Sequence, residues 1–399
     1  ARTPRRGAAR LPTTFTRGSK LLKMNGMRLL CVRRLCAAAR VSTKPNAIVR
    51  VRGGQHGGDV RLVTNAESDV VTVLASRAGV TVVDGARVTP PEGGADFEVC
   101  DTGGADLDIS VPASFNVDVA RSGRRSNVQI DGWIEGTVSA RADGGGDVSV
   151  HTVRGQVTTL STHHGNVSAE LIDGDADLYT GQGDIDIKKS QGRTLSAHAN
   201  GGGGVTAQAI YCDEAKVSAG ARGIHMKFLG ARKALLESNA GDIRLGSVDG
   251  DLHARAADGS IQVQLTNMAR TLELEADGDI DVLVPVHLRF DARARAPSVE
   301  IDQAFAGNIA SDSTHGSERE VLLRGLPTAA GGSGGAEGEA RAPKASRLKR
   351  RNSDPDGEDQ EIVSPGEGPS VTAVSTRGTV RFIERSWVQG VLASRGTAQ

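Results

Sequence analysis

The chain has 399 residues, enough for one large or two ordinary domains, and with 51 glycines and only 3% aromatic residues its core must be filled by Val, Ile, Leu and Ala. Residues 1–45 hold twelve Lys/Arg and no acid, which leaves 48 − 12 = 36 basic against 48 acidic residues in the remainder, a net charge of −12. An acidic body argues against nucleic acid as a partner, and no apolar run reaches the roughly 18 residues of a membrane span.

Residues 1–45 form a basic leader. From Met24 the sequence MNGMRLLCVRRLCAAARVSTKP interleaves arginines with Leu and Val, and it contains Ser and Thr but no acid. A helix of this composition has a basic and an apolar side, as mitochondrial transit peptides have. We expect a disordered or helical leader that is removed near Arg40–Lys44 and directs the protein to the mitochondrial matrix. The alternatives are a disordered basic tail and a nuclear signal, with the protein in the cytoplasm or the nucleus.

Residues 46–117 predict less regular strands. Short alternating stretches occur at 47–52, 59–63, 69–75 and 79–84, and a Pro90-Pro91 loop follows them. We expect these residues to form irregular N-terminal coils and a cap over the first end of the repeats that follow, because an uncovered sheet end invites edge pairing.

Residues 118–327 carry a regular repeat. Its units open on glycines spaced by 19, 18, 21, 19, 18, 18 and 19 residues, which are Gly146, Gly165, Gly183, Gly204, Gly223, Gly241, Gly259 and Gly278. A second, looser series of glycines lies between them, so each unit holds two short alternating stretches, as GDADLYTGQGDIDIKK at 174–189 shows. Alternation of period two indicates strands with one buried face, and Gly followed by Asp suits the corners between strands.

This repeat predicts an all-β fold, a parallel β-solenoid (β-helix) of roughly 19-residue coils with two short strands per coil. One repeat cannot bury its apolar row alone, but stacked repeats share a continuous core. Antiparallel hairpins in a sandwich or barrel are the chief rival, since Gly-rich corners about nine residues apart suit them too. The doubled period is nearly constant over more than seven units, which favours the solenoid.

The C-terminal part predicts an insert and a return to the repeat. Residues 328–369 are rich in Gly, Pro and charge, so we expect a disordered insert. Within it, Ser353 ends the motif RRNS and is a candidate phosphorylation site, and RLKRR resembles a nuclear signal. Residues 370–390 predict a closing strand, with Trp387 packed over the far end, and residues 391–399 form a tail.

The cysteines and histidines predict neither a disulfide framework nor a metal site. Only Cys100 and Cys212 lie outside the leader, and no Cys-x-x-Cys pair occurs. His163 and His164 precede a corner glycine, and adjacent strand residues point to opposite faces, so we interpret them as solvated turn histidines. We expect no cofactor.

Catalytic motifs are absent from the sequence: it has no Gly-x-Ser-x-Gly elbow, phosphate loop, His-Glu-x-x-His pair or dinucleotide fingerprint. The Gly-rich run at 199–205 lacks a following lysine and is interpreted as a loose corner. Polysaccharide-active β-helices place acidic and basic side chains on one lateral face, and the residues of those types here are Asp177, Asp184, Asp186, Lys188 and Lys189. Outward strand positions are polar in any solenoid, so we predict no catalytic residues.

The residues from Leu107 to Val150, with the Gly-Asp-Ile units after them, resemble the bacterial-type "putative adhesin" domain, a family of unknown molecular function. The leader, the closing GTVRFIERSW and the layout resemble its eukaryotic branch, named family with sequence similarity 185 member A. The similarity covers roughly 46–327 and 370–390, and the insert departs from it. The resemblance implies a β-helical domain and a mitochondrial address.

Together these features predict a non-enzymatic, adhesin-like β-solenoid that acts as an interaction scaffold for an unidentified protein or glycan. Two alternatives stay open: a calcium-dependent assembly module like a β-roll, and a polysaccharide-active β-helix enzyme. Asp175 and Asp184 follow corner glycines without the Gly-Gly-x-Gly frame of calcium β-rolls, so we predict that they bind no structural calcium.

Overall fold

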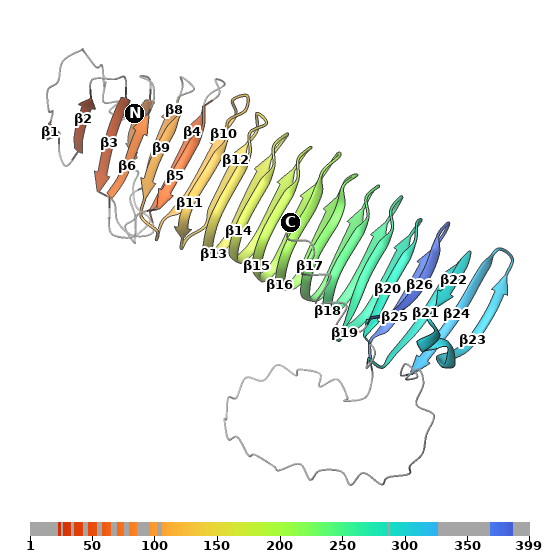
Figure 1. Cartoon of the computed structure of the whole chain (residues 1–399). Helices are drawn as coiled ribbons and strands as arrows, with labels where there is room; N and C mark the ends of the chain where they lie inside the picture. Colours follow the sequence, from red (N-terminus) through yellow and green to blue (C-terminus); the bar gives the residue numbers. More distant parts are fainter. Residues whose placement is uncertain are drawn as a thin grey trace, which may run out of the picture.

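The structure, a computed structural model, describes residues 23–24, 27–32, 36–42, 47–53, 58–64, 70–75, 80–85, 96–101, 106–285, 288–325 and 368–385. They form a rod of stacked parallel coils, which confirms the predicted β-solenoid (Figure 1). In this part of the chain no helix is long and apolar enough to cross a membrane.

The middle of the rod consists of seven long strands, each of which makes one coil. Every strand pairs in parallel with the next one along the chain, so its contacts are to residues one coil away. The strands are β13 (Val148–Thr162), β14 (Val167–Thr180), β15 (Ile185–Ala199), β16 (Gly204–Ala219), β17 (Gly223–Ser238), β18 (Ile243–Ala256) and β19 (Ile261–Ala276).

Each coil has two sides, as β13 illustrates. Its first half, 148–153, and its second half, 158–162, bury alternate side chains, and a bend joins them. Parallel pairing continues through this bend with only a register shift between Arg154 and Val157. The two short strands predicted per coil are therefore one continuous bent strand. We call the face built by the first halves the first side and the face built by the second halves the second side.

The core lies between the two sides and is aliphatic, as the composition required. Ile185 and Ile187 are both 0% exposed, whereas Asp186 between them is exposed. At the bend, Gly174 has φ of +135°, and a Cβ there would overlap the carbonyl oxygen of Gly155 in the preceding coil. Glycine is therefore required where neighbouring coils approach this closely.

At the N-terminal end, spatial order departs from chain order. The coil before β13 consists of β11 (Val128–Ile134) and β12 (Val138–Ala142), with β10 (Asn116–Arg121) beside β12. On the second side β4 (Ile48–Gly53) lies between β10 and β8 (Asp96–Asp101). On the first side β5 (Val60–Thr64) lies between β11 and β9 (Leu107–Val111). The pair β4–β5 is thus intercalated between segments that follow it in sequence.

Antiparallel strands pair with the parallel coils at this end. β6 (Val70–Ala75) pairs with β9, and β7 (Val80–Gly85) pairs with β8. Three strands from the predicted leader extend the sheet beyond β6, where we expected disorder or a helix: β3 (Cys36–Ser42), β2 (Met27–Val32) and β1 (Lys23–Met24). The free edge of β6 offers backbone hydrogen bonds that compete with helix formation by this segment.

The C-terminal end has a second intercalated pair. β25 (Ser370–Ser375) lies on the second side between β19 and β21 (Phe290–Ala296). β26 (Thr379–Arg385) lies on the first side between β20 (Ile280–Pro285) and β22 (Ser298–Ile301). The predicted closing strand is therefore a strand pair inside the stack, and Figure 1 shows it in blue among strands coloured cyan. Trp387 lies outside the described residues.

A short antiparallel cap completes the rod. β24 (Glu318–Gly325) pairs with β21, and β23 (Ile309–His315) pairs with β24. A 3-10 helix, η1 (Gln303–Asn308), starts at Asp302, whose side chain accepts the N–H of Ala304. The ring of Phe305 packs edge-on against Phe290 with centroids 5.5 Å apart. We call residues 288–325 the C-terminal cap.

Candidate functional site at a gap in the corner ladder

A row of side chains links the coils at the turns that lead into the first side. In each case a side-chain oxygen accepts the backbone N–H of the equivalent residue in the next coil, at 2.7 to 3.2 Å. In spatial order these residues, which we call the corner ladder, are Asp106, Asp59, Asn127, Asp147, Asn166, Asp184, Asp242, Ser260 and Asp279.

The ladder carboxylates are structural hydrogen-bond acceptors. The backbone N–H of Ser260 holds the pKa of Asp242 below its usual range, and that of Thr379 does the same for the pKa of Asp279. A carboxylate that accepts such bonds is stabilised in its charged form. The ladder carboxylates therefore fasten one coil to the next, and Asn127, Asn166 and Ser260 do the same through neutral side chains.

The ladder is interrupted at two successive coils, where Gly204 and Gly223 occupy the ladder position. A Cβ on Gly204 would lie 2.8 Å from the Cβ of Arg222, and Gly223 has φ of +76°. Neither position accepts a side chain without strain, because the turn between β16 and β17 passes close to Gly204 and because the φ of Gly223 is in the left-handed region. The two glycines therefore belong to a local departure from the repeat.

Arg222 spans this gap and borders a hollow. Its guanidinium forms an ion pair with Asp184, two coils away, while the other carboxylate oxygen of Asp184 accepts the Gly204 N–H at 2.9 Å. Beside this pair lies an open hollow of about 440 Å³, lined by Asp184, Ile185, Asp186, Gly204, Thr206, Arg222, Gly223 and His225. The charges of Arg222 and Asp184 offset each other, and Asp186 adds a second carboxylate to the lining.

Three more polar side chains line the hollow in a straight row on the first side. Asp186 is in register with Thr206, and Thr206 is in register with His225. Asp186 and Thr206 are exposed and His225 is half-buried. The row places a carboxylate, a hydroxyl and an imidazole at successive strand spacings of about 4.8 Å, and together they both accept and donate hydrogen bonds.

The five charged residues singled out in the sequence do not form one site. Asp184 and Asp186 both line the hollow. Asp177 is exposed on the second side, Lys188 forms an ion pair with Glu170, and the Nζ of Lys189 lies 5.7 Å from the ring centroid of Tyr211. Asp177, Lys188 and Lys189 are exposed and lie outside the hollow.

Asp175 resembles the ladder carboxylates, although it lies at the bend. Its Oδ1 accepts the N–H groups of Arg193 and Thr194, each at 3.1 Å, and its Oδ2 accepts from the Arg193 guanidinium at 2.8 Å. Burial alone would raise the pKa of Asp175, but these bonds outweigh it and lower the pKa. Among the described residues, no group of three or more His, Cys, Asp or Glu side chains could hold a metal ion.

His163, His164 and Cys212 do not line the hollow. His163 and His164 are exposed in the turn after β13, and His164 Nδ1 lies 3.0 Å from Gln182 Oε1, which agrees with the solvated turn predicted for them. Cys212 is a half-buried free thiol whose pKa burial raises to about 12, so it is not a reactive thiolate. Ser353 lies outside the described residues.

Sequence reasoning missed Thr206, Arg222 and His225. Two signals pointed to them: the step of 21 residues from Gly183 to Gly204, the longest in the repeat, and the absence of Asp, Asn or Ser at the ladder positions of these two coils. This step ends at the turn between β15 and β16, within the Gly-rich run interpreted as a loose corner, where Gly201 has φ of +61°. The departure from the period marks the hollow.

Part of the chain matches a known family. Residues 199–321, from the end of β15 into β24, match the model of the Toastrack DUF4097 family. No curated protein matches the chain in sequence. The expected likeness to adhesin-type domains thus has support at the level of this family, whereas no comparison bears on the eukaryotic branch.

Two solved structures are similar. A "putative adhesin" from Bacteroides fragilis NCTC 9343 is 10% identical with a TM-score of 0.26, and the match covers 88% of this chain and 97% of that one. A "putative cell adhesion protein" from Clostridium sporogenes ATCC 15579 is 7% identical with a TM-score of 0.18, over 88% of this chain and 99% of that one.

Proposed function

We propose that the protein is a non-enzymatic interaction scaffold whose first side presents the hollow to a protein or glycan. The corner ladder carries this proposal. Its carboxylates are the residue type that a polysaccharide-active β-helix uses for acid–base work, yet Asp184, Asp242 and Asp279 each accept a backbone N–H of the next coil. A group engaged in this way serves the stacking of the rod rather than proton transfer.

The hollow suits a polar ligand. Asp186, Thr206 and His225 offer acceptors and donors in one line, as hydroxyl groups of a glycan or a polar protein loop require. The strands that carry them are paired on both edges, so the row is held rigid and little conformational entropy is lost on binding.

The test removes the row without touching the ladder. Asp186→Ala with His225→Ala should abolish binding on a glycan array or remove a defined set of neighbours in proximity labelling of the intact protein in mitochondria. Asp177→Ala with His253→Ala, the same residue types on the second side, is the matched control and should keep the wild-type pattern. Equal patterns for both double variants would reject the hollow as the contact surface.

Direct assays distinguish this scaffold from the polysaccharide-active alternative. The purified protein should leave polysaccharides of different charge intact, whether incubated at neutral or at acid pH. Chain shortening or the appearance of unsaturated sugar products, lost in Asp186→Ala, would replace the scaffold by an enzyme at the same hollow.

The mitochondrial location and the membership in the eukaryotic branch are part of the proposal. The acid-free, Arg-rich composition of residues 24–45 supports them. Imaging of the tagged protein should place it in mitochondria, and N-terminal sequencing should find a start near Arg40–Lys44. An intact leader on a cytosolic or nuclear protein would contradict this address.

A further inference from the structure

The pair β25–β26 fills a slot between the rod and the C-terminal cap. On the second side β25 is bonded in parallel to β19 on one edge and to β21 on the other. On the first side β26 is bonded in parallel to β20 and to β22. The cap therefore meets the rod through a segment that comes from the far end of the chain.

The slot holds this segment by apolar burial. The segment supplies one complete layer of the core, because Val371, Ala373, Val380 and Phe382 are all between 0% and 1% exposed. The ring of Phe382 lies 6.1 Å from that of Phe290 in the cap. The cap and the rod would both lose apolar cover if the segment left.

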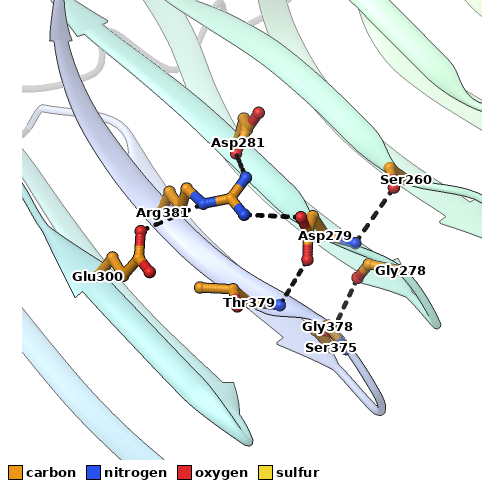
Figure 2. A network of polar contacts seen from close by, with 9 residues as sticks. All are labelled: Ser260, Gly278, Asp279, Asp281, Glu300, Ser375, Gly378, Thr379 and Arg381. Atoms are coloured by element: carbon orange, nitrogen blue, oxygen red, sulfur yellow. Dashed lines mark hydrogen bonds and ion pairs between the residues drawn. The ribbon is translucent and has the colours of Figure 1, made fainter.

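Polar contacts bind the segment to both walls of the slot. Figure 2 shows Arg381 between β20 and β22, with its guanidinium 2.7 Å from Asp279, 3.0 Å from Asp281 and 3.2 Å from Glu300. Asp279 also accepts the N–H of Thr379 at 2.8 Å. One side chain of the segment therefore contacts the rod and the cap at once.

The turn between β25 and β26 is fixed to the rod as well. Ser375 donates its hydroxyl to the carbonyl oxygen of Gly278 at 2.8 Å and accepts the N–H of Gly378 at 2.9 Å. Arg377 forms ion pairs with Asp258 and Asp277 of the two preceding turns. The segment thus repeats the corner chemistry of the coils beside it.

The connection to this segment is far longer than the distance it covers. Gly325 is the partner of Phe290 on one edge of β21, and Pro369 accepts the N–H of Asp291 on its other edge, at 3.0 Å. The two ends are thus two strand spacings apart, about 10 Å, which three or four residues can bridge. Residues 326–367, however, number 42, and at about 3.3 Å per residue they can reach a neighbouring molecule.

We propose that the slot is a peptide-binding site and that residues 368–385 are its resident ligand. These residues are held in the slot by their contacts and not by the connection to the cap. The same segment of a second copy of the chain can therefore bind in the slot in trans. Parallel strand addition on both walls supplies the backbone bonds, and the alternating apolar residues with Arg381 supply the specificity. This site is separate from the hollow, so it stands or falls independently of the proposed scaffold function.

The first test cuts the connection in the full-length protein. A sequence-specific protease site inserted after Gly335 allows cleavage of the folded chain, followed by size-exclusion chromatography without denaturant. The C-terminal fragment should elute with the rod. Its immediate separation would overturn the proposal.

A variant pair shows that the slot contacts retain the fragment. Arg381→Ala removes the three ion pairs of a half-buried guanidinium and should speed release of the cut fragment roughly tenfold. Arg293→Ala, which removes the ion pair of Arg293 with Glu320 inside the cap, should release it at the wild-type rate. Equal rates for the two variants would contradict the role of Arg381.

The second test examines the partner in trans. One full-length version carries an N-terminal affinity tag, and another carries a C-terminal fluorophore; the two are mixed, cut and captured on the affinity tag. Captured fluorescence is expected, and it should vanish when the fluorescent version carries Val371→Asp with Phe382→Asp. If no fluorescence were captured, or if the double substitution left the captured fluorescence unchanged, the proposed exchange between copies would be overturned.

Discussion

The middle of the rod and its two ends use the same corner chemistry with different chain connections. In the middle, each ladder bond joins residues 18 to 20 apart, as from Asn166 to Asp184 or from Asp184 to Gly204. At the C-terminal end, the equivalent bond joins Asp279 to Thr379, 100 residues away. At the N-terminal end, it joins Asp59 to Asn127, 68 residues away. The geometry of the coil therefore determines which residue types form the ladder bonds, whether the neighbouring coil is close in the sequence or far from it.

The difference has energetic consequences. A middle coil closes a loop of about 19 residues, whereas each intercalated pair closes a much longer one at a higher entropic cost. Removing a middle coil would interrupt the core in both directions, whereas removing β25–β26 would uncover only the last strands of the rod and the C-terminal cap. The ends should therefore open before the middle does, in units set by the intercalated pairs.

The largest effect is expected from a charge in the middle of the core. Ile185 is 0% exposed, so Ile185→Asp places an unpaired carboxylate among apolar side chains and should cost several kcal/mol of unfolding free energy. Asp186→Ser, one residue along on the exposed face, should be nearly silent. Chemical denaturation of both variants is the measurement, and equal losses would mean that inside and outside are assigned wrongly.

A smaller, local effect is expected at the C-terminal end. Phe382→Ala leaves a cavity beside Phe290 and should cost about 3 kcal/mol, chiefly by loosening the cap. Leu178→Ala in β14, also fully buried, is the matched middle-coil change. A second, lower-temperature transition in calorimetry should appear for Phe382→Ala and not for Leu178→Ala; one shared transition for both would contradict the separation into end and middle.

Acid should weaken the polar contacts that hold β25–β26 against the rod. The Thr379 N–H and Arg381 keep the pKa of Asp279 low in the fold, and the Thr376 hydroxyl and Arg377 do so for Asp277. A carboxyl whose pKa is lowered by folding stabilises the fold above its unfolded pKa of about 4, and this stability is lost as the pH falls through the folded pKa.

Asp279 is partly exposed, so solvent screens its charge, and we expect protonation of Asp279 to lower the free energy of unfolding by less than about 1 kcal/mol. Denaturation at pH 7 and pH 3 measures it, and Asp279→Asn, which has no charge to lose, should show a smaller pH dependence than the wild type. If Asp279→Asn and the wild type showed the same pH dependence of stability, Asp279 would not be responsible for the loss in acid.

Thr158→Val should raise the free energy of unfolding by about 0.5 to 1 kcal/mol. Thr158 is 0% exposed, and its hydroxyl oxygen is the buried side-chain atom without a hydrogen-bond partner among the described residues. Its register partner Val138 holds the same place in the preceding coil. Replacing an unsatisfied hydroxyl by a methyl group of similar size should raise the melting temperature. A lower melting temperature would mean that the Thr158 hydroxyl has a hydrogen-bond partner.

Calcium should have no effect on stability. The oxygens of Asp175 and Asp184 already accept N–H groups and pair with arginines. A ligand bound only by the native state must raise its melting temperature. Unfolding in millimolar calcium and in excess chelator should therefore coincide; a rise abolished by Asp175→Ala with Asp184→Ala would restore the calcium-dependent assembly.

The sequence predicted the middle of the rod well because its contacts are local and periodic. Alternation placed Ile185 and Ile187 inward, and the strands expected at 47–52 and 59–63 lie within a residue or two of β4 and β5. The intercalation of β4–β5 and of β25–β26 was not predictable, because a repeat pattern shows which residues make a coil but not which coil lies next to it.

The hollow was missed for a related reason. Asp184 and Asp186 were noticed as charges, but their neighbours Arg222 and His225 come from two coils further along the chain, and only the register brings them together. The long step before Gly204 was visible in the sequence, yet the glycine spacing alone does not reveal that Arg222 crosses the gap to Asp184.

Hydrogen exchange of the Phe382→Ala protein, followed by mass spectrometry of its peptides, tests the central claim that β25–β26 attach the cap to an independently stable rod. Peptides from 288–325 and 368–385 should lose protection, while those from 148–256 keep the wild-type rates. Leu178→Ala should raise exchange in its own and the adjoining coils first. Equal loss of protection along the whole chain in Phe382→Ala, or an unchanged cap, would contradict the account.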